Sequence, residues 1–166
     1  MDFTIENIGI IVLVVLAGLS AGLCFTWSNS ITPGIGRLND FGYLASFQEM
    51  NRAILNPTFF IVFFGPLFLG LINLYVLRNS SNSIIVLLIL AIGIYLFGVL
   101  IVTIFGNVPL NEILDKTELT TSSIEELKVL REKFEAKWNR LHLIRTVSSS
   151  LSFLFLVITL LIKNNT

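Results

Sequence analysis

The sequence predicts an all-α integral membrane protein, a four-helix bundle that occupies residues 1–166 as a single transmembrane domain. Hydrophobic residues make up 54% of the chain and charged residues only 13%, about half the charged share of a typical soluble domain. The apolar residues fall in four long runs, and each run approaches the ~20 residues with which a helix crosses a ~30 Å hydrocarbon core. The four spans are predicted at about 8–27, 57–77, 84–105 and 146–162.

In the first half of the chain, a membrane helix leads into a short amphipathic helix. The Pro33-Gly34 pair is expected to break the first helix soon after its apolar run. Asn39-Asp40 can cap a helix over residues 41–55, whose apolar residues recur at helical spacing but which is too short and too mixed to cross a membrane. Asn56-Pro57 is a good start for the second membrane helix.

The second half has the same plan. The polar residues 78–83 predict a tight turn, and the third apolar run ends at residues 106–109. The residue before a proline avoids helical geometry, which predicts a helix boundary or a re-start there. Ser122-Ser123 stand three residues before Glu125-Glu126, a doubled capping-box pattern that predicts a helix start. The helix that follows is amphipathic to about residue 144 and leads into the last span.

The two amphipathic segments both end in an Asn-Arg pair, Asn51-Arg52 and Asn139-Arg140. An internal duplication is one explanation of this echo, and chance is the other. Because each half crosses the membrane twice, the polar segments 28–56 and 106–145 are expected on one face of the membrane. That face holds all of the 11 Lys and Arg residues except Arg78 and Lys163, so the positive-inside rule predicts that it is cytoplasmic and that both termini lie outside. The expected location is a bacterial inner (plasma) membrane.

Composition also argues against several kinds of site. The net charge is zero, so no basic surface indicates a nucleic-acid partner. The only cysteine, Cys24, cannot form an internal disulfide or a cysteine-cluster metal site. The only histidine, His142, argues against metal cages built from histidine pairs. No metal and no cofactor are therefore predicted, although a haem with His142 as its single strong axial ligand stays open.

Five asparagines near the ends of the predicted membrane helices are candidates for substrate binding. An amide offers two hydrogen-bond donors and an acceptor oxygen, so it can bind a carbonyl or a hydroxyl group. The structural alternative for each of them is a helix cap or a turn. Their gathering at one end of the bundle favours a polar pocket, and they are Asn29, Asn51, Asn56, Asn107 and Asn111.

Trp138, His142 and Arg145 are spaced by four and three residues, which places them on one face of a helix. A histidine can move a proton near neutral pH, an arginine can hold an anionic intermediate, and an indole can stack on a flat ligand. Arg52 is a second candidate for stabilising negative charge. The alternatives are an interfacial anchor for Trp138, a hydrogen-bonded side chain within the bundle for His142, and a snorkelling side chain for Arg145.

Four stretches occur in order along the chain: Gly22–Asn29, Met50–Pro57, Asn107–Asn111 and Trp138–Thr146. On these stretches the chain resembles a family of small four-helix membrane proteins, a domain-of-unknown-function family that includes the anthrone oxygenases. The resemblance covers almost the whole chain. It implies site roles for Asn29, Asn51, Arg52, Asn56, Asn107, Asn111, Trp138 and Arg145, whereas family members often have Asn near the position of His142.

The resemblance implies a membrane-embedded, oxidoreductase-like protein that acts on a small apolar aromatic or quinone-like molecule without an organic cofactor. Anthrone oxygenases convert an activated aromatic methylene to a ketone with dioxygen. The alternative is a non-catalytic membrane protein that binds a lipid-like ligand or a partner subunit, so the sequence leaves open whether the chain is an enzyme. The expected partners are membrane lipid, a small apolar ligand and a second copy in a homo-oligomer.

Overall fold

In a computed structural model of the chain, which describes residues 4–164, every regular element is helical. The predicted location of the two termini concerns residues 1–3 and 165–166, which lie outside the described part. Three of the elements are π-helical turns that continue an α-helix with wider hydrogen bonding. The elements in order are α1 (Ile5–Thr26), η1 (Trp27–Ile31), α2 (Thr32–Ile35), α3 (Asp40–Ile54), α4 (Pro57–Val76), α5 (Asn82–Tyr95), η2 (Leu96–Ile101), η3 (Thr103–Asn107), α6 (Val108–Asp115) and α7 (Ile124–Asn164).

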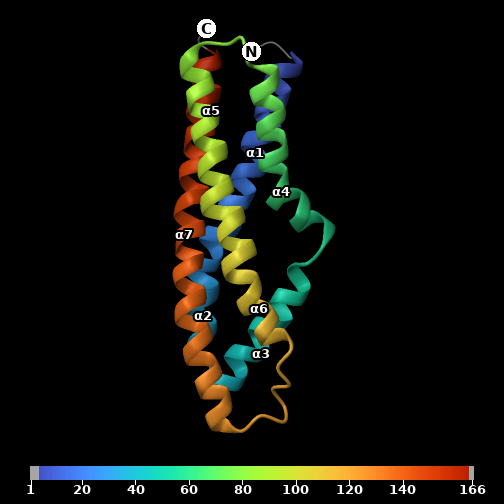
Figure 1. Cartoon of the computed structure of the whole chain (residues 1–166), viewed down its shortest axis with the longest axis vertical. Coiled ribbons are helices and arrows are strands. Elements are labelled where there is room, and N and C mark those ends of the chain that lie inside the picture. The colour runs from blue at the N-terminus through green and yellow to red at the C-terminus, as the bar shows by residue number, and fades with distance from the viewer. Residues whose placement is uncertain (1–3, 165–166) are drawn as a thin grey trace.

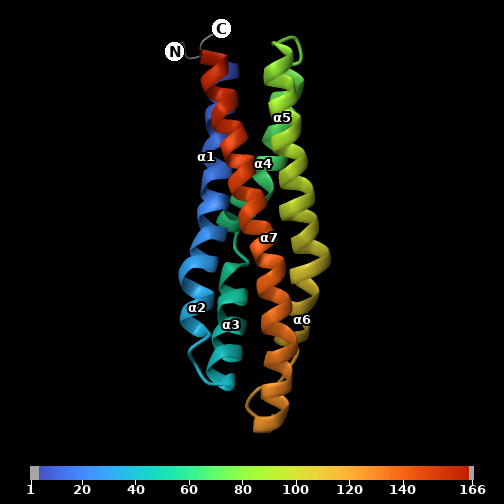
Figure 2. The ribbon, with the colours of Figure 1, turned by 90° about the vertical axis from the view of Figure 1, so that its left-hand side faces the viewer.

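Four continuous helical stretches are long and apolar enough to cross a membrane: Ile5–Ile35, Pro57–Val76, Asn82–Asp115 and Ile124–Asn164. They stand side by side in one elongated bundle, with the starts of α1 and α5 and the ends of α4 and α7 at the same end (Figure 1). The predicted all-α four-helix membrane bundle is confirmed, and we treat the chain as an integral membrane protein. The opposite end is built from α2, α3, α6 and the first part of α7 (Figure 2).

Pro33 and Pro109 each follow a π-helical turn, and neither proline by itself interrupts the helix. At each of them the helix passes through a π-helical turn and continues, since the amide of Thr32 bonds the Trp27 carbonyl and the amide of Val108 bonds the Thr103 carbonyl, both five residues back. A proline lacks the amide hydrogen that regular α-helical bonding needs, and the wider turn before it shifts the bonding register. The first stretch still ends at Ile35, directly after the Pro33-Gly34 pair as predicted, whereas the third runs on to Asp115 with a re-start of α-helical bonding at Val108.

The second amphipathic segment and the last span form one 41-residue helix, α7. At 1.5 Å per residue this helix is roughly 60 Å long, about twice the hydrocarbon core of a bilayer. The amphipathic part of α7 therefore extends the bundle beyond the membrane-spanning part instead of folding away from it.

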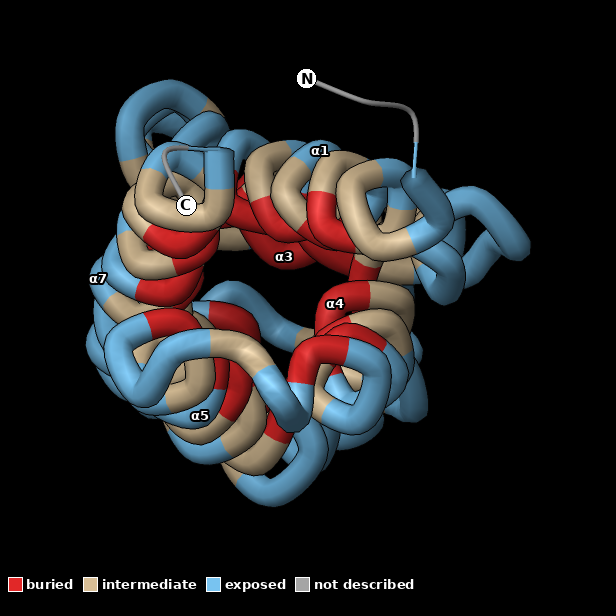
Figure 3. Tube along the Cα trace, turned by 90° about the horizontal axis from the view of Figure 1, so that it is seen from above, coloured by how far each residue is buried: buried red, intermediate tan, exposed pale blue. Residues whose placement is uncertain are grey.

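In the membrane-spanning part, each helix packs on two neighbours: α1 on α4 and α7, and α5 on α4 and α7. Viewed along the bundle, the buried residues face the centre and the exposed residues face outwards (Figure 3). Helix η2 approaches α7 closely at Gly98, where an added Cβ would overlap the side chain of Ser148. The apolar core here consists of Ile10, Leu13, Ala17, Leu77, Ile84, Leu88, Ala91, Ile92 and Leu156.

Three predicted helix starts are confirmed by their capping bonds. The Asn39 side chain accepts from the amide of Gly42 (2.8 Å) and starts α3. Ser123 and Glu126 form the capping box before α7, since the Ser123 amide donates to Glu126 Oε2 (2.8 Å) and the Glu126 amide donates to Ser123 Oγ (3.3 Å). Each bond satisfies a backbone amide that the first helical turn leaves without a partner. The third start is at Asn56, whose side chain accepts from the Phe59 amide at the beginning of α4.

Candidate functional site

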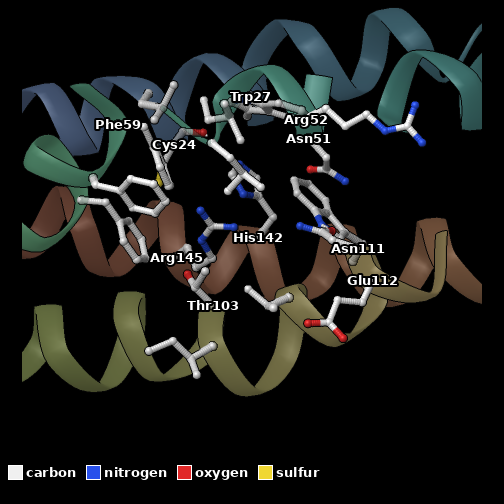
Figure 4. A pocket seen from close by; sticks show the side chains of 18 of the residues that line it. Cys24, Trp27, Asn51, Arg52, Phe59, Thr103, Asn111, Glu112, His142 and Arg145 are labelled. Atoms are coloured by element: carbon white, nitrogen blue, oxygen red, sulfur yellow. Dashed lines mark hydrogen bonds between the residues drawn. The ribbon is translucent and has the colours of Figure 1, made fainter. Parts of the chain in front are cut away.

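A cavity of about 350 Å³ lies inside the bundle where α3 gives way to α4. Its volume falls at the lower end of the range of small-molecule sites. Figure 4 shows side chains from α1, α3, α4 and α7 converging on this space, together with side chains from the continuous helical stretch Asn82–Asp115. Most of the wall is apolar, and the polar groups are few. The walls include Leu23, Cys24, Trp27, Asn51, Arg52, Leu55, Phe59, Phe60, Phe63, Phe64, Thr103, Ile104, Val108, Asn111, Glu112, Trp138, His142 and Arg145.

The cavity exists because the chain is interrupted at Leu55-Asn56. Asn56 caps α4, since its Oδ1 accepts from the Phe59 amide (3.0 Å), and its Nδ2 donates to the Ala53 carbonyl (3.0 Å). These two bonds fix the change of direction between α3 and α4, which Figure 1 shows as a loop that bulges from the bundle. Asn56 is exposed and does not line the cavity. Its position supports the capping alternative.

Arg145 is the one cavity-lining cation from a membrane-spanning helix, within the described residues, that has no carboxylate partner. Its Nε is buried and makes no hydrogen bond. The groups that interact with its guanidinium include the Cys24 thiol, the Tyr95 phenol and the His142 imidazole, and none of them is a carboxylate. A buried charge without a counter-ion is costly, so an anionic group placed in this cavity would be strongly favoured.

His142 lies between α7 and α1 and is buried. Its Nε2 is 3.0 Å from the Cys24 carbonyl oxygen, and its ring stacks on Trp138 with centroids 4.7 Å apart and an interplanar angle of 15°. Because a carbonyl only accepts, Nε2 carries the hydrogen and Nδ1 carries the lone pair. Nδ1 is buried without a partner. In this arrangement Nε2 is engaged by the Cys24 carbonyl, and only Nδ1 is left without a hydrogen bond.

Trp138 is held from α6 and η3 by two asparagines. Its indole Nε1 donates to Asn111 Oδ1 (2.8 Å), and its carbonyl accepts from Asn107 Nδ2 (3.4 Å). Asn107 is fully buried and does not line the cavity, whereas Asn111 does. The two amides therefore fix the indole against the cavity, and only Asn111 is also in a position to meet a ligand.

The remaining predicted residues differ in their surroundings. Asn51 lines the cavity, and its Nδ2 is buried without a partner. Arg52 lies at the rim, where it bonds Asp115 and Glu49, each at 2.8 Å. The hydrogen bond to Asp115 raises the pKa of Arg52, so this side chain stays charged and is already neutralised by carboxylates. Asn29 is exposed on η1, away from the cavity.

The structure thus brings together six of the nine predicted residues: Asn51, Arg52, Asn111, Trp138, His142 and Arg145. It does not bring Asn29, Asn56 or Asn107 into the cavity. Asparagine serves a cap or a helix contact as readily as a ligand, and the sequence offered no way to separate these uses.

Sequence reasoning missed the aromatic wall of the cavity. Phe59, Phe60, Phe63 and Phe64 form two pairs spaced by four residues on α4, and the rings of Phe59 and Phe63 stack with centroids 5.1 Å apart. This spacing, which places both pairs on one side of a helix, was a readable signal. Cys24, which the sequence does not mark as a site residue, also lines the cavity and interacts with Arg145.

Among residues 4–164, no three His, Cys, Asp or Glu side chains come together as metal ligands do. A family model described as anthrone oxygenase matches residues 59–155, which is more than half of the chain and includes most of α4, all of α5 and α6, and most of α7. Comparison with curated proteins and with solved structures gave no match.

Proposed function

This chain belongs to the anthrone oxygenase family, and on that premise we propose that it is a membrane-embedded oxygenase for a small, flat, apolar molecule with an ionisable aromatic or quinone-like ring system. The observation that carries the proposal is the position of Arg145. Its guanidinium lies without a carboxylate partner in a cavity walled by phenylalanines, where a flat apolar ligand and a negative charge can be accommodated together.

The reaction that fits this site oxidises an activated aromatic methylene. Loss of a proton from the methylene gives a delocalised anion whose charge rests largely on the ring oxygen, and Arg145 would stabilise that oxygen as it becomes negative. The anion supplies the electrons, so that CH₂ and O₂ become C=O and H₂O. The methylene carbon is oxidised, one oxygen atom stays on it, and the other leaves as water with both hydrogens.

The other cavity residues have supporting roles in this proposal. The Phe59 and Phe63 rings would pack on the ligand, and Trp138 would offer its edge and face where Asn111 holds it. Asn51 would donate to a ligand oxygen. His142 stays a candidate for receiving the proton through the lone pair on Nδ1, but only after its ring turns towards the cavity, because Nδ1 is buried.

The location of the site is also part of the proposal. We place the end with α2, α3 and α6 in the cytoplasm of a bacterial cell, because it carries most of the Lys and Arg residues. In this orientation the cavity lies near the cytoplasmic membrane surface, with lipid and a small apolar ligand as its partners. Assembly of the chain into a homo-oligomer, which was predicted from the sequence, also stays a proposal.

The test is oxygen uptake by the purified protein in lipid vesicles with anthrone as the substrate. Arg145→Met should lower the rate at least tenfold relative to the native protein, and Arg145→Lys should retain part of it because the charge remains. Arg140→Met, on the exposed side of the same helix, is the matched control and should leave the rate unchanged. Uptake that exceeds protein-free vesicles equally in all four proteins would overturn the proposal.

The second candidate function is ligand binding without turnover. The use of Asn56, Asn107 and Asn111 in bonds within the protein favours it, because these amides stabilise the bundle and not a reaction. In this case anthrone would quench the fluorescence of Trp27 and Trp138, which both line the cavity, in a saturable way, while no oxygen would be consumed above the protein-free rate. Arg145→Met would then weaken quenching only.

A further inference from the structure

The cavity opens sideways, between α4 and the rod formed by η3 and α6. Leu55 and Phe60 stand on one side of this opening, and Ile104 and Val108 stand on the other. All four line the cavity, and all four are also exposed on the outer surface, with exposed fractions of 64%, 44%, 44% and 38%. A residue that reaches both the cavity and the outside marks the place where the two communicate.

The outer surface around this opening is apolar. Phe105, the residue after Ile104, is 77% exposed and does not line the cavity, and Leu143 on α7 is exposed at about the same level of the bundle. Exposed aromatic and aliphatic side chains that continue around the bundle are what a bilayer covers in a membrane protein. The opening therefore faces lipid.

Towards the end of the bundle that holds α3 and α6, the same cavity meets charged side chains instead. Arg52 on α3 bonds Asp115 on α6 at 2.8 Å, and Lys116 lies 3.5 Å from Glu112. The pair between Arg52 and Asp115 links the two helices across the rim. A neutral apolar molecule gains nothing by passing between paired charges in water, whereas it is concentrated in the bilayer by its own hydrophobicity.

We propose that the cavity is filled from within the bilayer, through a portal bounded by Leu55, Phe60, Ile104 and Val108, and that its ligand is a flat lipid-soluble compound with one acidic oxygen. The apolar ring system crosses the portal and packs on the phenylalanine wall, while the oxygen points to Arg145. The ligand chemistry rests on the proposed function, but the route does not, and it is tested without any turnover.

Cys24 provides the test, because it is the only cysteine of the chain and lines the cavity. The protein in phosphatidylcholine vesicles is treated with N-phenylmaleimide or with its sulfonated form, and the adduct is measured from the mass of the intact protein. Each rate is divided by the rate of the same reagent with glutathione. Loading from lipid predicts a corrected rate at least tenfold higher for the neutral reagent, although Arg145 would attract the sulfonate.

Neighbouring residues supply the matched variants. Ile104→Trp narrows the portal and should slow labelling by the neutral reagent several-fold, whereas Ile104→Ala should accelerate it. Phe105→Trp adds the same side chain one residue away, outside the cavity, and should leave the rate unchanged. Cys24→Ala must remove the adduct. Thermal unfolding in detergent identifies any variant that is merely misfolded.

Any of three results would overturn the proposed portal. The corrected rates of the two reagents could be equal, Ile104→Trp and Phe105→Trp could have equal effects, or neither reagent could form an adduct. Oxygen uptake that still depends on Arg145 would then leave the proposed function standing with another route to the cavity. A working portal without oxygen uptake would give the opposite result, so the two proposals can fail separately.

Discussion

The two halves of the chain start from one plan and end in different structures. Each half has a membrane helix with a π-helical turn before a proline, and each has an amphipathic segment that ends in an Asn-Arg pair. In the first half this segment, α3, stops at Ile54, and α4 starts afresh at Pro57. In the second half the corresponding segment continues without interruption into the membrane as α7.

The difference shows how one plan provides both a space and the groups that face it. The interruption before α4 leaves room beside α1 and α7, and that room is the cavity. The uninterrupted helix carries Trp138, His142 and Arg145 on one rigid face across the level of the interruption. A break in both halves would leave these side chains on a loop, and a break in neither would fill the cavity with helix.

A break introduced into the second half should have the largest effect. Ile144→Pro removes the amide hydrogen of residue 144 from the middle of α7 and places a ring against the preceding turn, which costs about 3 kcal/mol or more. We expect a large fall in the thermal unfolding midpoint in detergent and loss of labelling selectivity at Cys24. Ile144→Ala, at the same lipid-facing position, is the control, and an equal midpoint for both variants would contradict a structural need for continuity.

The contact between η2 and α7 should be the next most sensitive. A Cβ at Gly98 would overlap Ser148, so Gly98→Ala should destabilise the bundle by roughly 2 kcal/mol. In the first half, a Cβ at Gly22 would meet nothing, and Gly22→Ala should be tolerated. Chemical denaturation in mixed micelles measures both. If Gly98→Ala leaves the stability unchanged both in the native background and in a Ser148→Gly background, then η2 and α7 do not pack closely at this position.

The two halves are tied together at the far end of the bundle by Arg131 of α7. It donates to the carbonyls of Gly36 and Leu38, both at 2.8 Å, and its side chain is only 15% exposed. Arg131→Met should cost about 1.5 kcal/mol, because hydrogen bonds from a charged donor are lost. Lys128→Met, on the exposed face one turn earlier, should have no effect on the denaturation midpoint. Similar midpoints for both variants would show that the tie contributes little.

The cap of the interrupted half should give the smallest effect. Asn56→Ala removes the acceptor for the Phe59 amide and should cost about 1 kcal/mol, whereas Asn56→Ser keeps a capping oxygen and should stay near the native stability. Both variants keep the interruption, so labelling of Cys24 by the neutral maleimide should persist. Faster unfolding of the serine variant than of the alanine variant would argue against the cap.

Much of the fold was predictable, because it depends on local patterns. The four apolar runs, the caps at Asn39 and Asn56 and the capping box at Ser123 act over a few residues, and all are present in the structure. That the second amphipathic segment and the last span form one uninterrupted helix was left open, because the hydropathy changes sharply near residue 145 while the backbone hydrogen bonding does not. A change of solvent along a helix is no reason for the helix to end.

The candidate site was predicted less completely, because it depends on which way side chains point in three dimensions. Spacing placed Trp138, His142 and Arg145 on one face, and they do face the cavity together. Asn29 and Asn51 were both predicted to bind a ligand, yet the first is exposed and the second lines the cavity. The residue type is the same at both positions, and the direction of each side chain depends on how the helices pack.

The sequence by itself determined that this chain spans a membrane with four helices, because burying about twenty apolar side chains in lipid outweighs every other local preference. Only the tertiary structure decided that Arg145 would have no carboxylate partner while Arg52 has two. Pairing is set by distances between helices that are far apart in the chain. Those distances follow from the packing of the whole bundle around its one interruption.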